Sequence, residues 1–232
     1  MEKSCLDFGD CGQTAIGYNM PIDELDIDKD PQRFLVYEWA GYKKNRGNKM
    51  AEYYFDIETY SPGDKPNPVT DKIITIQFQR VDLRTGKPRE NLVILKEWES
   101  SEKQIVTEFF NKFFADGLNV WDFVPVGYNL DFEWEFLISK FNKYLGKCLS
   151  SKDLHYKRPY LDLKPIVVLL NNGNFVGAKL TNFTDKAQDG KVIKNYYENK
   201  LYDEIEKYIK NETDSFLQFL QKIKSNIHKL VE

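Results

Sequence analysis

The chain has 232 residues, a formal net charge of −3 and an aromatic content of 15%. A chain of this length can bury one substantial hydrophobic core, and the 14 tyrosines and 16 phenylalanines exclude disorder throughout. The slightly acidic balance excludes binding to nucleic acid through overall charge, so any such binding needs a local basic patch.

The cysteines and the apolar runs set further limits. The three cysteines, Cys5, Cys11 and Cys148, form no Cys-x-x-Cys pair, which argues against a disulfide framework and against a zinc ribbon. The start of the chain has no apolar core of the signal-peptide type. The longest aliphatic run, at 166–170, is far shorter than the roughly 20 residues that cross a bilayer. The sequence therefore predicts a soluble cytoplasmic protein without a membrane partner.

The first 49 residues differ from the rest of the chain. They lack helical periodicity and carry an acidic run at 23–30, which we interpret as a solvated loop. Residues 33–39 are apolar and aromatic enough to form a strand, and a basic turn follows at 43–49. We therefore expect an N-terminal extension, residues 1–49, before a main domain at 50–232.

The main domain begins with three predicted strands. Residues 52–58 form the first strand, and a loop rich in proline and glycine leads to the second at 73–79. A turn at 84–88 joins it to a third strand at 91–95. Three strands in succession predict an antiparallel start to the sheet.

Helices and a further strand follow this start. Ser100 or Ser101 can cap a helix with one apolar face, residues 119–126 are apolar enough for a buried strand, and a second helix is predicted at 131–145. An RNase H-like fold begins with the same order of elements, which is three strands, a helix, a strand and a helix. The fold prediction is an α/β domain with a central mixed five-stranded sheet flanked by helices.

The segment at 146–159 mixes basic and aromatic residues, among them Lys157 and Arg158. This composition suits a groove in which cations meet phosphates and rings stack on bases, and a solvated loop is an equally good interpretation. Asp162 precedes Leu163-Lys164-Pro165, a pattern typical of a helix N-cap with proline in the first turn. We therefore assign Asp162 to capping.

Two acids on the first strand face the same way. Side chains of a strand alternate between its faces, so Asp56 and Glu58 emerge on one side, and Phe55 and Ile57 on the other. Adjacent carboxylates repel each other unless cations lie between them or water covers the face. A metal site and a solvated strand face are the two alternatives.

Two helices supply further acids. In the last helix the apolar stripe has a gap between Ile209 and Phe216, and Glu212 fills it, with Tyr208 one turn before on nearly the same face. Asp214 points away. By the same argument Glu133 faces inward, whereas Asp131 belongs to the polar first turn of its helix. Hard oxygen ligands of this kind suit Mg²⁺ or Mn²⁺.

Three short motifs resemble those of a known family. Phe-Asp-Ile-Glu-Thr at 55–59, Gly-Tyr-Asn-Leu-Asp-Phe-Glu at 127–133 and Tyr-Ile-Lys-Asn-Glu at 208–212 resemble the three exonuclease motifs of the DEDD superfamily, the DnaQ-like exonucleases. The tyrosine four residues before the last acid is similar to the DEDDy branch, and the chain resembles compact archaeal single-strand exonucleases in particular. The resemblance covers the chain from about residue 52 onward.

The resemblance implies a 3′→5′ exonuclease that hydrolyses single-stranded DNA to mononucleotides with two Mg²⁺ or Mn²⁺ ions. Asp56, Glu58, Glu133 and Glu212 would hold the ions, and Tyr208 would orient or help deprotonate the attacking water. The residues expected to contact the nucleic acid are Thr59, Tyr60, Asn129 and Phe132, together with Lys157 and Arg158 in the basic segment.

The sequence departs from the family at two positions, since Glu133 and Glu212 stand where aspartate is usual. Glutamate is longer by one C–C bond, about 1.5 Å, and Mg²⁺ demands near-ideal octahedral geometry. Either the backbone shifts to compensate, or Asp131 and Asp214 replace the glutamates, or metal binding is weakened. The inward facing expected of Glu133 and Glu212 favours the glutamates as ligands.

Two other functions stay open at this point. The chain could be a nucleic-acid-binding or assembly module that keeps the fold with weakened catalysis, or a 3′→5′ exoribonuclease, because no residue identifies a contact to a 2′-hydroxyl. The oligomeric state is open as well. One alternative is a homo-oligomer in which residues 1–49 contact a neighbouring subunit.

Overall fold

The computed structural model describes residues 50–63, 65–184, 190 and 192–226. The N-terminal extension, with its predicted strand at 33–39 and its acidic and basic segments, lies outside the described residues. Within the described part of the chain, no helix is long and apolar enough to cross a membrane.

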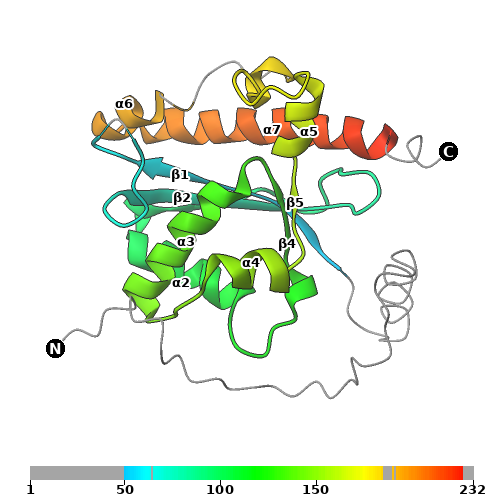
Figure 1. The fold of residues 1–232 in the computed structure, drawn as a ribbon. Helices are drawn as coiled ribbons and strands as arrows, with labels where there is room; N and C mark the ends of the chain where they lie inside the picture. Colours follow the sequence, from blue (N-terminus) through cyan, green and yellow to red (C-terminus); the bar gives the residue numbers. More distant parts are fainter. Residues whose placement is uncertain (1–49, 64, 185–189, 191, 227–232) are drawn as a thin grey trace, which may run out of the picture. The chain divides into compact units, whose positions relative to one another are not determined.

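The five strands form one mixed sheet in the order β3-β2-β1-β4-β5 (Figure 1). β1 pairs antiparallel with β2, and β2 antiparallel with β3, whereas β4 runs parallel to β1 and β5 parallel to β4. This is the topology of an RNase H-like fold, so the fold prediction is confirmed. The strands are β1 (Glu52–Tyr60), β2 (Lys72–Val81), β3 (Val93–Lys96), β4 (Val124–Gly127) and β5 (Leu161–Asp162).

The helices connect and cover the strands. Ser101 caps the first of them, because its side chain accepts a hydrogen bond from the backbone of Gln104. Single turns of 3₁₀-helix occupy Glu97–Glu99, Val120–Asp122 and Leu180–Asn182. The α-helices are α2 (Glu102–Phe113), α3 (Leu130–Leu145), α4 (Ser151–Lys157), α5 (Lys164–Leu170), α6 (Val192–Glu198) and α7 (Tyr202–Asn226).

Two local predictions need correction. The stretch at 119–126 is a strand only from Val124, because Asn119 caps a 3₁₀ turn before it. The basic segment at 146–159 is not an irregular loop, since α4 forms there. Ser150 and Asp153 start that helix with a capping box, each side chain bonding the other's backbone N–H.

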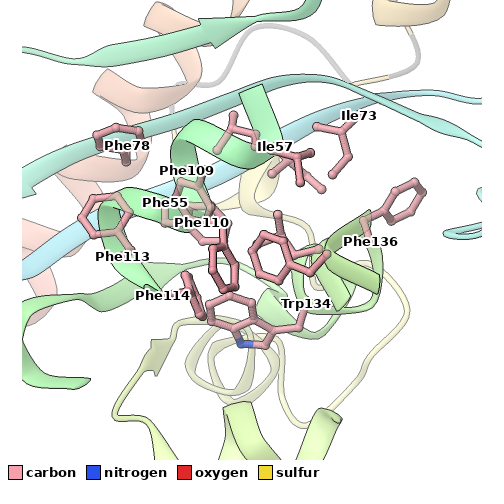
Figure 2. Close-up of a cluster of buried hydrophobic side chains, with 14 of the residues drawn as sticks. Phe55, Ile57, Ile73, Phe78, Phe109, Phe110, Phe113, Phe114, Trp134 and Phe136 are labelled. Carbon is pink, nitrogen blue, oxygen red and sulfur yellow. The ribbon is translucent and has the colours of Figure 1, made fainter. Parts of the chain in front are cut away.

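Separate apolar clusters cover the two faces of the sheet. On one face, Phe55 stacks on Phe109 of α2 and on Trp134 of α3, with ring centroids 5.2 and 5.5 Å apart (Figure 2). On the other face, Tyr54 packs against Phe216 of α7. Because successive residues of β1 face opposite layers, Asp56 lies on the α7 side with Tyr54.

The β4–α3 junction brings two backbones close together. A Cβ at Gly127 would lie 2.4 Å from a methyl carbon of Leu130 and 2.9 Å from the carbonyl oxygen of Phe55. Only glycine fits there, so the junction holds the first turn of α3 against β1.

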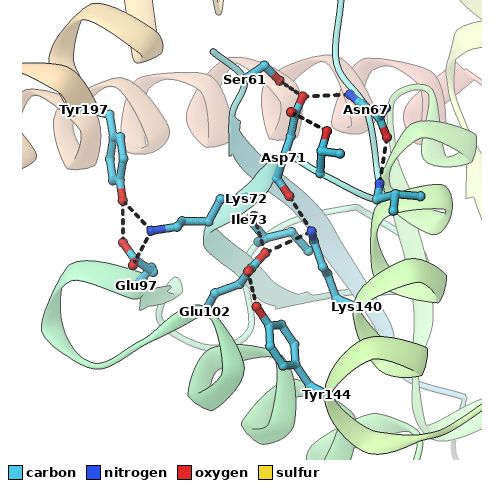
Figure 3. Close-up of polar contacts among 12 residues, drawn as sticks. Ser61, Asn67, Asp71, Lys72, Ile73, Glu97, Glu102, Lys140, Tyr144 and Tyr197 are labelled. Atoms are coloured by element: carbon cyan, nitrogen blue, oxygen red, sulfur yellow. Dashed lines mark hydrogen bonds and ion pairs between the residues drawn. The ribbon is translucent and has the colours of Figure 1, made fainter. Parts of the chain in front are cut away.

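A buried polar network fixes the connection between β1 and β2 (Figure 3). Lys140 of α3 is fully buried; it donates a hydrogen bond to the carbonyl oxygen of Asp71 and lies 3.4 Å from a carboxylate oxygen of Glu102. Glu102 also accepts hydrogen bonds from the backbone N–H of Ile73, at 2.8 Å, and from the hydroxyl of Tyr144. The network ties α2 and α3 to the start of β2.

Candidate active site

Three carboxylates from two elements converge on one point. Asp56 and Glu58 lie two residues apart on β1, and Glu212 reaches them from α7, which crosses the same face of the sheet. One carboxylate oxygen from each residue lies within 4.8 Å of the others. Asp56 and Glu58 of β1 thus lie together with Glu212 of α7, as their expected facing requires.

The apolar stripe of α7 explains why Glu212 faces this site. Tyr208, Ile209 and Phe216 are buried, and Thr213 fills the gap between them, with its hydroxyl bonded to the carbonyl oxygen of Ile209. Glu212 lies beside this stripe and is half-buried. The prediction that Glu212 fills the gap is therefore corrected, because Thr213 fills it and Glu212 lies beside the stripe, where it lines the cavity.

Tyr208 is buried one turn before Glu212 and lines the same cavity. Burial raises the pKa of its phenol far above the usual value, and the nearby negative charges of Glu58 and Glu212 raise that pKa further. The hydroxyl therefore keeps its proton at neutral pH and can donate a hydrogen bond.

Glu133 joins the site from the first turn of α3. It is buried, and burial followed by the charge of Asp56 raises its pKa well above the usual range. Its Oε2 atom has no hydrogen-bond partner among the described residues. A buried carboxylate oxygen without a partner is costly, and a cation between Glu133 and Asp56 would remove that cost.

The two aspartates kept as alternatives to the glutamates lie elsewhere. Asp131 is exposed and bonds to His155 of α4, with 2.7 Å between Oδ1 and Nε2. Asp214 is exposed on α7, and neither residue lines the cavity. Glu133, which is buried, and Glu212, which is half-buried, both line it.

A pair of buried residues on β2 holds Asp56. Gln77 lies opposite Asp56 in the β1–β2 register, and its Nε2 donates to Asp56 Oδ2 at 3.0 Å. The Oε1 atom of Gln77 accepts a hydrogen bond from the Thr75 hydroxyl at 2.9 Å, which fixes the orientation of the amide. The sequence alone does not indicate this role of Gln77, because the role depends on strand register.

These side chains open on one cavity of about 410 Å³. Of the residues expected to bind nucleic acid, Asn129 and Phe132 line it. The cavity is also lined by residues for which the sequence predicted no site role, of which the polar or small ones are Tyr128, Lys164, Ala178, Lys179, Thr181 and Gly190.

The other expected nucleic-acid contacts lie outside the cavity. Tyr60 packs on Tyr197 of α6, with ring centroids 4.9 Å apart, and Thr59 follows an irregularity in the β1–β2 register. Lys157 forms an ion pair with Asp153 within α4.

Arg158, predicted to contact nucleic acid, is engaged by the protein. Its guanidinium lies over the Phe114 ring, 4.2 Å from the centroid, and donates to the carbonyl oxygen of Phe113. The structure therefore does not bring Arg158 together with the acids.

Asp162 acts between two helices. It accepts hydrogen bonds from the backbone N–H groups of Asn129 and Leu130 at the start of α3, and from that of Lys164 at the start of α5. The predicted capping role is thus shared between two helices, although the N-cap position of α5 itself is Leu163.

The donor set fits a hard divalent cation. Asp56, Glu58 and Glu212 offer carboxylate oxygens only, which Mg²⁺ and Mn²⁺ prefer. The buried, unpaired oxygen of Glu133 supplies a further ligand position beside Asp56. A cation there would offset the burial and the negative charge of Asp56, which together raise the pKa of Glu133.

Comparison with known proteins gives distant structural similarity. A scan against protein-family models finds no match, and a search of curated proteins finds none. Among solved structures, the chain is similar to E. coli exonuclease I in complex with a dT13 oligonucleotide, with a TM-score of 0.41 and 12% identity over 53% of this chain and 30% of that chain. It is also similar to a moderately thermophilic exonuclease I from Methylocaldum szegediense, with a TM-score of 0.40 and 16% identity over 53% and 30% of the two chains. The matched part of this chain thus spans less than a third of each of those proteins.

Proposed function

We propose that the chain is a 3′→5′ exonuclease that hydrolyses single-stranded DNA to mononucleotides with two Mg²⁺ or Mn²⁺ ions. The observation that carries the proposal is the convergence of Asp56, Glu58 and Glu212 within 4.8 Å, with the buried Glu133 beside Asp56. The order of the three sequence motifs around these residues supports it.

Each side chain has a role in this proposal. Asp56 and Glu58 on the rigid strand β1 would hold both ions together with Glu212, and Glu133 would complete the ligand set. Bound metal supplies an activated water and stabilises the charge that develops on the attacking and leaving oxygens. Tyr208, which keeps its proton, orients the attacking water by a hydrogen bond.

The test is digestion of a single-stranded oligonucleotide with Mn²⁺, followed by gel analysis. A 5′-labelled strand is expected to give a ladder that shortens from the 3′ end, whereas a 3′-labelled strand releases its label as a mononucleotide at once. Asp56→Asn and Glu212→Gln are expected to abolish both. No laddering by the wild type, or laddering that Asp56→Asn leaves unchanged, would overturn the proposal.

Matched control variants test which acids matter. Asp131→Asn and Asp214→Asn remove exposed acids within two residues of Glu133 and Glu212 and are expected to retain activity. If these controls lose activity while the glutamine variants of Glu133 and Glu212 keep it, the assignment of the glutamates is wrong.

Digestion of DNA and RNA strands of the same sequence distinguishes the proposed activity from that of an exoribonuclease.

The non-catalytic alternative also has an observation in its favour, because Glu133 lies outside the group of three acids whose oxygens meet within 4.8 Å. Calorimetric titration with Mn²⁺ distinguishes the two functions. Two binding sites support the enzyme, and none supports the binding module.

A further inference from the structure

The rim of the cavity carries a cation that the metal chemistry does not use. Lys164 is half-buried at the start of α5 and lines the cavity with the acids. It forms no ion pair with any described carboxylate, including those of the site, and its ammonium donates a hydrogen bond to Oδ1 of Asn129. A half-buried ammonium without a counter-charge is a binding position for an anion.

The contact with Lys164 fixes the orientation of the Asn129 amide. An ammonium can only donate, so the amide oxygen of Asn129 faces Lys164 and its NH₂ group points away from Lys164. Both side chains therefore offer N–H donors, the ammonium of Lys164 and the NH₂ group of Asn129, which suit a ligand made of acceptors, such as phosphate.

The helix N-terminus next to this pair is already occupied. The first backbone N–H groups of α3, those of Asn129 and Leu130, donate to the carboxylate of Asp162, at 2.8 and 3.0 Å. An anion in the cavity would therefore meet the side chains of Lys164 and Asn129. Asn129 also adopts a left-handed backbone conformation, with φ of 65°, which asparagine tolerates and which holds its side chain at this junction.

We propose that Lys164 and Asn129 form a phosphate subsite that binds an internucleotide phosphate next to the one being hydrolysed. The acids and their metals would take the scissile phosphate, and Lys164 lines the same cavity without forming an ion pair with those acids. The subsite selects a strand over a mononucleotide. It rests on the proposed function, since it assumes that the ligand of this cavity is a nucleic acid.

Equilibrium binding tests the subsite without hydrolysis. A 5′-fluorescein-labelled single-stranded oligonucleotide is titrated with protein in EDTA, and its anisotropy is measured at several salt concentrations. Lys164→Gln is expected to raise Kd about tenfold and to reduce the slope of log K against log salt by about 0.7, the value for one phosphate contact on a single strand. Lys164→Arg is expected to restore most of the binding, and Lys103→Gln, at an exposed lysine on α2, is the matched control.

Asn129→Asp separates binding from a purely structural role. It keeps the size and the backbone tolerance of asparagine but gives Lys164 a carboxylate partner. A phosphate subsite predicts weaker oligonucleotide binding with an unchanged or higher thermal midpoint. Unchanged Kd and salt slope in both Lys164→Gln and Asn129→Asp would overturn the subsite.

A substrate with one phosphate tests the position of the contact. The p-nitrophenyl ester of thymidine 5′-monophosphate has no neighbouring phosphate, so Lys164→Gln is expected to lower kcat/KM for this ester much less than kcat/KM for the oligonucleotide. Equal losses on both substrates would overturn the assignment to the neighbouring phosphate. If the wild type binds the oligonucleotide through Lys164 but hydrolyses nothing, the proposed activity fails and the subsite stands.

Discussion

Gln77→Met is expected to weaken metal binding without unfolding the protein. Gln77 is fully buried on β2, where its amide donates to Asp56 Oδ2 at 3.0 Å and accepts from Thr75 at 2.9 Å. Methionine has a similar length and no donor, so the Asp56 carboxylate loses one of the hydrogen bonds that orient it. A hydrogen bond to a charged group contributes about 1.5–3 kcal/mol, which corresponds to a factor of about 10 to 150 in an equilibrium constant.

Thermal unfolding across a Mn²⁺ titration measures this effect. Metal that binds only the folded state raises the midpoint with concentration, and the Mn²⁺ concentration needed for a given rise is expected to increase about 10- to 100-fold in Gln77→Met. Gln79→Met is the control, because Gln79 is two residues along the same strand and its amide bonds to the Glu90 carbonyl. An unchanged Mn²⁺ dependence in Gln77→Met, or the same shift in Gln79→Met, would refute the positioning role.

Three further predictions concern buried or partly buried charged groups. Glu133→Gln removes a buried acid whose pKa is raised by burial and by Asp56. The thermal midpoint without metal is therefore expected to stay or rise, while the rate of oligonucleotide hydrolysis falls about 10- to 100-fold. A lower midpoint with full activity would contradict this. Lys140→Met leaves the buried Glu102 carboxylate without its cation, so the free energy of unfolding measured in urea is expected to fall by about 3–5 kcal/mol. The double variant Lys140→Met, Glu102→Gln is expected to recover part of this loss. A loss below about 1 kcal/mol would contradict the role of the network. Hydrogen bonds from Lys157, against a smaller effect of burial, lower the pKa of Asp153 to about 2 from 3.8, so its contribution is present above about pH 4 and is lost as pH falls toward 2. Solvent screening limits this contribution to about 1 kcal/mol, and Asp153→Asn should flatten that part of the acid stability curve.

Periodicity predicted the elements that carry the acids. The alternation of β1 placed Asp56 and Glu58 on one face, and the three- and four-residue spacing of α7 placed Glu212 inward and Asp214 outward, as the structure has them. These predictions succeed because a strand and a long amphipathic helix each have one fixed side-chain period. The side of a strand or helix on which a side chain lies is therefore a local property, which can be predicted from the sequence without tertiary contacts.

Roles that depend on tertiary contacts were beyond the sequence. Gln77 supports Asp56 through strand register, and Tyr60 packs on Tyr197 from a distant part of the chain. The basic and aromatic composition around Arg158 predicted a contact with phosphate, yet its guanidinium lies over the Phe114 ring. The helix α4 did leave a local signal in Ser150 and Asp153, whose spacing is that of a capping box.

The longer side chains at two acidic positions need not prevent metal binding, because the two glutamates stand in different places. Glu212 sits beside the buried stripe of α7, and its carboxylate reaches within 4.8 Å of those of Asp56 and Glu58. The added length therefore brings Glu212 to the strand acids from a helix on the same face of the sheet. Glu133 comes from α3, whose apolar residues pack on the opposite face, and it stays outside that group while lying close enough for Asp56 to raise its pKa. If metal binding is weakened in this protein, the geometry locates the weakness at Glu133, whose partner across the site is Asp56, the residue that Gln77 holds in place.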